Sequence, residues 1–354
     1  MVKIVKHRIP SWRKAYFSGL PFSRIMLPLF SLLQSLPIVS LLQGQEQRFR
    51  AKRHLLTVAC SAALLTLLGS CATRPVAETN QDDPLAHSLL WSITGNGLSD
   101  TSWLYGTIHL ISQEDFFVRP EVEAAMASCD QVAFEIKLND LSMMMTMMRL
   151  LKLPGDSTLA DVVSADRYQR LTAFVEDSLG LSMASYDRQK PMALMQVLVQ
   201  QMVPGTPASY ELDFMQRALS AEQSIEGLET VEDQMAVFDG IPMDEQVDWI
   251  LQMAENRDSM QALYGDLVAA YRAEDLTALQ QLIMEDSPEM AEYNDELLTN
   301  RNRNWIPRIG ALAAESPVFI AVGAGHLPGE TGVIRLLEEA GYILQAIPPS
   351  ADRP

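Results

Sequence analysis

A short motif, Gly-x-x-His, occurs twice in this chain, each time at the end of a predicted strand. Gly106-Thr-Ile-His109 follows an aromatic run that ends at Tyr105, and Gly323-Ala-Gly-His326 follows the apolar run 317–322. After both motifs the pattern predicts a helix and then another strand. Loops at the carboxyl ends of strands in α/β sheets gather at one edge. We therefore expect two matching half-units whose imidazoles meet if the two strands are neighbours.

The segments around these motifs also predict strands and helices of an α/β domain. Two short runs, 88–93 and 101–105, flank Gly-Asn-Gly and predict a hairpin. A proline with neighbouring acids starts a helix at 119–128, and 131–136 is a compact strand, so a βαβ unit with parallel strands is expected. Helical patterns fill 139–315, with one strand at 224–229. The prediction is a mixed sheet from two βαβ-like halves, with a large helical insertion between them that covers the site.

The charge distribution separates an N-terminal region from the body of the chain. The net charge is −18; the first 53 residues contribute +9, residues 54–71 carry no formal charge, and the rest therefore carries −27. An acidic body argues against nucleic acid as a partner, because phosphate binding requires clustered Lys and Arg. A basic, then apolar, then acidic order is typical of a targeting segment ahead of a soluble domain.

Residues 50–71 resemble the signal peptide of a bacterial lipoprotein. Arg50, Lys52 and Arg53 precede an apolar stretch of about 14 residues, which ends in the lipobox-like Leu-Gly-Ser-Cys71. A membrane-spanning helix is the alternative, but a span needs about 20 apolar residues. The resemblance implies that Cys71 is the site of lipidation, that the protein is held to the membrane through this lipid anchor, and that it lies on the outer membrane facing the periplasm.

The remaining boundaries follow from this assignment. Residues 1–49 form an N-terminal extension, either a start codon assigned too far upstream or a real amphipathic segment, and residues 72–86 are a polar tether. The domain is predicted at 87–350. Within it Cys129 is expected to be a small buried hydrophobe, and the run Met143–Met148 to serve packing or substrate contact, with metal ligation as the less favoured alternative.

His109, His326 and Glu135, which lies at the end of the strand 131–136, are the candidate site residues. Two imidazoles and a carboxylate suit a divalent ion such as Mn, Co or Zn. Such an ion would support hydrolysis with a nearby carboxylate as base. The alternative is that each histidine is an ordinary core or turn residue, but the repetition of the motif in matching contexts counts against it.

Several motifs in fixed order resemble the TraB/GumN family, which includes the Tiki metalloproteases and is distantly similar to erythromycin esterase and haem-binding ChaN-like proteins. They are Leu90-Trp91, Trp103-Leu-Tyr-Gly-Thr-Ile-His-Leu110, Val132-Ala-Phe-Glu135, Gly227-Leu-Glu-Thr230 with Gln234, Arg301-Asn302 and Val322-Gly-Ala-Gly-His-Leu-Pro-Gly-Glu330. The resemblance covers roughly residues 86–348.

The resemblance implies an erythromycin esterase/ChaN-like fold and a metal-dependent hydrolase. His109, His326 and Glu135 would form its centre, with Gly106 and Gly323 as the motif glycines. Arg301 would hold an anionic transition state or a substrate carboxylate; a surface arginine is the alternative. Glu229 is either a residue behind the site or the cap of the following helix.

Three functions are in competition at this point. The first is a metallohydrolase that acts on peptides or another small substrate. The second is a non-catalytic lipoprotein that binds haem, iron or a hydrophobic ligand, with the methionine-rich helix over the same cleft. The third is a scaffold that has lost its activity, which the intact histidines and glutamate disfavour.

Overall fold

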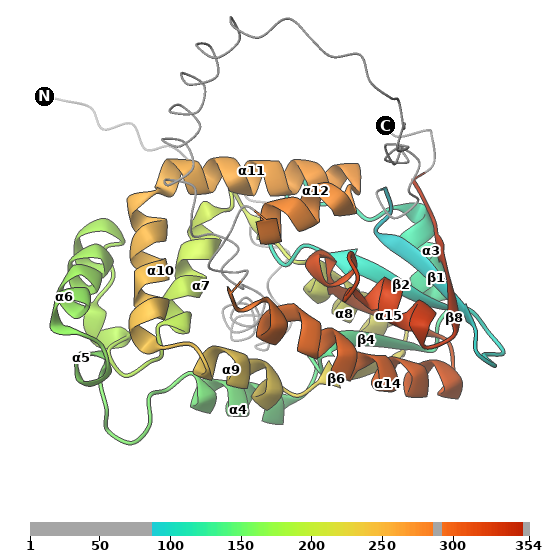
Figure 1. Ribbon diagram of the computed structural model, residues 1–354, viewed down its shortest axis with the longest axis horizontal. Coiled ribbons are helices and arrows are strands. Elements are labelled where there is room, and N and C mark those ends of the chain that lie inside the picture. The colour runs from blue at the N-terminus through green and yellow to red at the C-terminus, as the bar shows by residue number, and fades with distance from the viewer. Residues whose placement is uncertain (1–86, 286–291, 350–354) are drawn as a thin grey trace, which may run out of the picture.

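The computed structural model describes residues 87–285 and 292–349. The predictions for residues 1–86, including the lipobox, Cys71 and the tether, lie outside these ranges. Within them, no helix is long and apolar enough to cross a membrane. The domain combines a mixed sheet with many helices (Figure 1).

Six strands form the main sheet, in the order β6-β4-β7-β2-β1-β8. They are β1 (Leu90–Gly95), β2 (Ser102–Thr107), β4 (Gln131–Ile136), β6 (Ser224–Glu229), β7 (Val318–Gly323) and β8 (Tyr342–Ala346). β6, β4, β7 and β2 run parallel, while β1 is antiparallel to both β2 and β8. The prediction of a mixed sheet is therefore confirmed.

The hairpin of β1 and β2 forms at the predicted turn. Gly95, Asn96 and Gly97 all have positive φ angles of 78°, 46° and 81°, a conformation that glycine adopts without strain and asparagine tolerates better than most residues. The chain therefore reverses within a few residues, and β2 points its carboxyl end toward the first Gly-x-x-His motif.

The strands of the two predicted half-units alternate in the order of the sheet. The first is β2, helix α3 (Pro120–Ala127) and β4; the second is β7, helix α15 (Val333–Glu339) and β8. β7 lies between β2 and β4 and pairs with both, so β2 and β4 are parallel, as expected, without being neighbours. Because β2 and β7 are neighbours, both Gly-x-x-His motifs leave the same edge of the sheet. The erythromycin esterase/ChaN-like arrangement stays a prediction.

In the described part of the segment between β4 and β7, the elements are helical apart from β6 and β5 (Pro207–Ala208); β5 pairs with β3 (Ile111–Ser112), which lies between β2 and α3. The α-helices here are α4 (Leu141–Leu150), α5 (Leu159–Val162), α6 (Ala165–Ala173), α7 (Met192–Met202), α8 (Tyr210–Ser220), α9 (Val231–Asp239), α10 (Met243–Glu255), α11 (Arg257–Ala273), α12 (Leu276–Gln280) and α14 (Asn300–Glu315). In Figure 1, α5, α6, α7 and α10 lie at the left, at the opposite end of the molecule from β8.

The core beside the sheet is aromatic. Tyr105 of β2 and Phe319 of β7 pack against Phe214 of α8, with ring centroids 5.6 and 5.4 Å apart. Tyr271 of α11 shares a hydrogen bond with Tyr105 and donates one to the carbonyl oxygen of Gly106. These contacts fix α8 and α11 against the strand that carries the first motif.

Candidate metal centre

Both motif glycines lie where a Cβ atom would be crowded by its neighbours. A Cβ atom at Gly106 would lie 3.1 Å from the Cα of Ala324 in the second motif. A Cβ atom at Gly323 would lie 3.3 Å from both the Oε1 of Glu135 and the Nε2 of His109. The absence of these side chains lets the two loops pack closely without displacing their neighbours, and the same packing brings His109 next to Glu135.

A buried glutamate that the sequence analysis missed holds His109. The Nδ1 of His109 lies 2.9 Å from the Oε1 of Glu211 in α8, and the Thr107 and Ser209 hydroxyls donate to the same carboxylate at 2.7 and 2.9 Å. Burial lowers the pKa of His109, but the hydrogen bond and charge of Glu211 outweigh it, so the pKa is raised overall. With Nδ1–H bound to Glu211, Nε2 is the atom left to bind a cation.

His326 is held in the same way by an amide. Asn302 donates from Nδ2 to the carbonyl oxygen of Thr331 at 2.8 Å, so its Oδ1 faces the Nδ1 of His326 at 2.6 Å and accepts a hydrogen bond from the Nδ1–H. Burial and the neighbouring charge of Arg301 lower the pKa of His326 to about 3. The imidazole is therefore neutral, with its lone pair on Nε2.

Glu135 lies between the imidazoles and Arg301. Its Oε1 accepts the backbone N–H of Gly323 at 3.0 Å and lies 3.8 Å from the Nε2 of His326. Its Oε2 accepts from Arg301 at 2.7 Å and from Gln234 at 3.1 Å. Burial raises the pKa of this carboxyl, but Arg301 and the two imidazoles lower it by a larger amount. The pKa therefore lies well below its usual range, and Glu135 is ionised.

All five N–H groups of Arg301 have acceptors inside the protein. Nη2 donates to Glu135 and to Glu229 at 2.7 and 2.6 Å, and Nε donates to Glu229. Nη1 donates to the carbonyl oxygen of Leu297 at 3.0 Å and faces the Nε2 of His326 at 3.3 Å. Arg301 is 5% exposed, so it is not a surface arginine. That Arg301 contacts a substrate remains a prediction. In the structure its hydrogen bonds hold the carboxylates of Glu135 and Glu229 in place.

Glu229 lies behind the site, and Thr230 is the cap of helix α9. The Thr230 hydroxyl accepts the backbone N–H of Asp233, and the Asp233 side chain accepts the N–H of Thr230. Glu229 instead accepts hydrogen bonds from Arg301 and from the indole N–H of Trp305 at 3.0 Å. It therefore holds the Nε and Nη2 edge of the guanidinium, next to Glu135.

The donor atoms fit a divalent ion in chemical character. Two imidazoles, each bound through Nδ1 to a protein acceptor, are the usual arrangement of metal-ligating histidines, and the third donor is an ionised carboxylate. In the described ranges, no group of three or more His, Cys, Asp or Glu side chains is already arranged as a metal cage. The Nη1 of Arg301 would have to release the Nε2 of His326 for coordination.

The charge around the centre also favours a cation. Among the described residues of the centre, the carboxylates of Glu135 and Glu229 share the guanidinium of Arg301, and a third carboxylate, Glu211, binds His109. Three carboxylates and one guanidinium sum to a formal charge of −2, which a proton on His109 would reduce to −1. Since buried charges require partners, a divalent ion would complete the balance.

The methionine run 143–148 and Cys129, which the sequence also suggested for attention, are not among the residues of this centre. Met143, Met144 and Met147 are buried in α4, while Met145 and Met148 are 63% and 45% exposed. The run thus packs the helix on one side only. Cys129 is buried, as predicted, and burial raises the pKa of its thiol to about 12.

Three residues of the centre had no role in the sequence analysis: Glu211, Asn302 and Trp305. Glu211 follows Ser209 at the start of a helix, where an acid is common for helix stability alone, so its sequence context carries no sign of a functional role. Asn302 was visible as the neighbour of Arg301, but its contact with the Nδ1 of His326 depends on how α14 crosses the second motif.

The fold and the site define a class: mixed α/β proteins in which two strand-end imidazoles and a buried glutamate meet at one edge of the sheet. The chain belongs to the TraB/PrgY/gumN family, whose profile matches residues 89–346.

Curated relatives of the chain carry the name metalloprotease. Metalloprotease TIKI1 of Danio rerio is 24% identical over 329 residues, which cover 77% of this chain and 65% of the relative. The TIKI homolog of Nematostella vectensis is 21% identical, with 79% and 72% covered, and TIKI1 of Homo sapiens is 23% identical, with 76% and 63% covered. The match thus spans less than two thirds of the first of these proteins. No solved structure matches the chain.

Proposed function

We propose that this protein is a metal-dependent hydrolase that cleaves peptides, with His109, His326 and Glu135 as the ligands of a divalent ion. One observation carries the proposal: both imidazoles bind protein acceptors through Nδ1, so Nε2 is in each ring the atom left to bind an ion, beside an ionised carboxylate. The name of the relatives, metalloprotease, supports peptides as the substrate class.

Each residue of the centre has a separate task in this proposal. When bound, an ion such as Mn²⁺, Co²⁺ or Zn²⁺ supplies Lewis-acid chemistry, which polarises a carbonyl group and makes water more acidic. Glu211 and Asn302 fix the two imidazole rings. The low pKa of Glu135 suits a ligand that stays ionised more than a base that must take up a proton.

The test combines metal content with peptide hydrolysis. Full-chain protein is loaded with Mn²⁺, Co²⁺ or Zn²⁺, its metal content is measured, and a peptide library is digested and read by mass spectrometry. His109→Ala and His326→Ala should lose both metal and cleavage. His87→Ala is the matched control, because His87 is exposed and outside the site, and it should retain both. Equal metal content in all four proteins, or cleavage that survives in both site variants, would overturn the proposal.

The competing function, a haem-binding lipoprotein, receives no support from the cavity beside the histidines. Its volume is about 80 Å³, whereas sites for ligands of drug size occupy roughly 300–1,000 Å³. Haem titration of the purified protein should therefore give no new visible absorption bands.

The proposal includes a location. The lipobox-like sequence at Cys71 supports a lipid-anchored protein on the outer membrane that faces the periplasm. Mass spectrometry of the mature protein should find an acylated N-terminal Cys71, and Cys71→Ser should release the protein into the soluble fraction. A mature chain that begins elsewhere and carries no lipid would contradict this part of the proposal and leave the hydrolase unaffected.

A further inference from the structure

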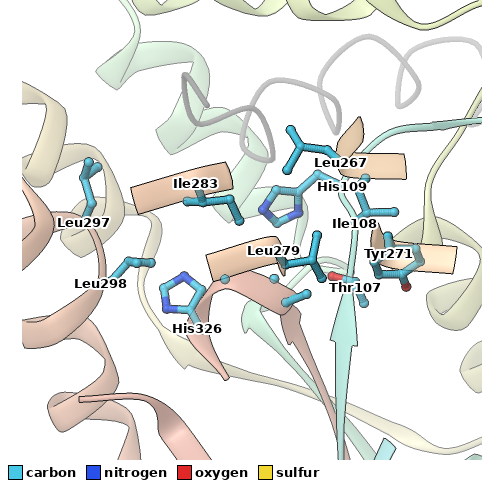
Figure 2. Close-up of a pocket in the computed structure, with 13 residues that line it drawn as sticks. Thr107, Ile108, His109, Leu267, Tyr271, Leu279, Ile283, Leu297, Leu298 and His326 are labelled. Atoms are coloured by element: carbon cyan, nitrogen blue, oxygen red, sulfur yellow. The ribbon is translucent and has the colours of Figure 1, made fainter. Parts of the chain in front are cut away.

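An apolar cavity opens directly beside the two imidazoles. His109 and His326 both border it, and Figure 2 shows them with Leu279, Ile283 and Leu298 around the same space. The cavity therefore adjoins both imidazoles of the proposed centre.

The described residues that line the cavity include no acid, lysine or arginine. Its two hydroxyl groups are both engaged elsewhere: Thr107 donates to Glu211 at 2.7 Å, and Tyr271 donates to the carbonyl oxygen of Gly106 at 3.1 Å. The walls away from the imidazoles are aliphatic, formed by Leu267, Leu279, Ile283, Leu297, Leu298 and Ala324. A polar or charged group placed here would lose its hydration without gaining a partner, which is costly.

The volume limits the size of the occupant. The cavity measures about 80 Å³, roughly half of the ~150 Å³ of an engineered cavity that accommodates benzene. A branched or straight aliphatic group of three or four carbons fits this space, and an aromatic ring does not.

We propose that this cavity is the specificity pocket of the enzyme and takes an aliphatic side chain, such as that of leucine, isoleucine, valine or methionine, from the residue next to the scissile bond. This assignment rests on the proposed function, because it defines the substrate of the same centre. Ile283 is the specificity-determining residue most open to change: its side chain is only half-buried, whereas Leu267, Leu279 and Leu297 are at most 4% exposed.

The first experiment is substrate profiling of metal-loaded full-chain protein with peptides that differ at one position, X, which is Leu, Phe, Ala or Asp. The wild type should prefer Leu at one position beside the cleaved bond. Ile283→Phe fills the pocket and should lower kcat/KM for the Leu peptide about tenfold or more, with little effect on the Ala peptide. Ile283→Ala enlarges the pocket and should shift the preference toward Phe. Ile343→Ala is the matched control, because Ile343 is 62% exposed on β8, and it should leave the profile unchanged.

A second experiment separates this inference from the proposed function. Binding of the capped peptides N-acetyl-Ala-X-Ala-amide to the wild type and to Ile283→Phe is measured by saturation-transfer NMR, which requires no cleavage. Contact of the Leu methyl groups with the wild type, lost in Ile283→Phe, supports the pocket even if no peptide is hydrolysed, in which case the proposed hydrolase alone fails. Cleavage or binding that is indifferent to X, or that responds equally to Ile343→Ala, overturns the pocket and leaves the hydrolase standing.

Discussion

Replacement of Arg301 by methionine tests how the centre is held together. The substitution keeps a long side chain but removes every N–H that bridges Glu135 and Glu229. Two buried carboxylates then face each other without the cation between them. We expect Arg301→Met to destabilise the folded protein by about 3–5 kcal/mol, as measured for buried ion pairs that lose one partner.

The size of this effect follows from what remains after the change. Each hydrogen bond to a charged group contributes roughly 1.5–3 kcal/mol, and Arg301 makes bonds of 2.7 and 2.6 Å to the two carboxylates. Gln234 still donates to both of them, and Trp305 to Glu229. Glu229 can also take up a proton, because burial already raises its pKa. The loss is therefore smaller than the full cost of two bare buried charges.

The assay is urea unfolding of the full chain, followed by circular dichroism. Arg308→Met is the control, because Arg308 lies on the same helix and pairs with Glu226 at 3.0 Å, but its side chain is 42% exposed. Surface pairs contribute about 0–1 kcal/mol, so the control should unfold close to the wild type. The reasoning is refuted if Arg301→Met costs no more than Arg308→Met.

Three further results are expected. Asn302→Leu removes the acceptor that orients His326 and should weaken Mn²⁺ binding roughly 10- to 100-fold in calorimetry, as for other residues behind metal ligands; unchanged affinity would show that the amide has no such role. Glu211→Gln removes the charge that raises the pKa of His109, so this pKa should fall in an NMR titration of the metal-free protein, and an unchanged or higher value would contradict the assignment. Cys129 should resist alkylation at pH 8 in the folded protein, since its thiol has a pKa of about 12, and should react after urea is added; peptide mass spectrometry that finds it modified without urea would refute its burial.

The local pattern of the chain was enough to predict many of the elements. The strands predicted at 131–136 and 224–229 coincide with β4 and β6. For β4 the reason is that a short run rich in apolar residues between turn signals is typical of a buried strand. Glu135 was visible as a lone acid within such a run. The repetition of Gly-x-x-His is likewise a local pattern, and it was sufficient to indicate the two imidazoles.

Other features of the centre depended on contacts between distant segments. The insertion of β7 between β2 and β4 could not be predicted, since alternation and hydrophobicity describe a strand without naming its neighbours. The small sheet of β3 and β5 was missed because two-residue strands have no measurable period. Arg301 was expected to face a substrate. In the structure its five N–H groups point at acceptors inside the protein, which lie 4 to 166 positions away along the chain.

The sequence by itself was enough to predict the strands of the main sheet, the acidic character of the body, and the pair of motif histidines with Glu135 as candidate site residues. These follow from short-range patterns, because strand period, turn glycines and charge are properties of neighbouring residues. Only the tertiary structure decided that Glu211 and Asn302 direct both Nε2 atoms inward and that aliphatic side chains line the space beside them. The physical reason is that a hydrogen bond or a cavity wall requires atoms within a few ångströms, and in this fold the partners of the two imidazoles come from helices 102 and 24 residues away along the chain.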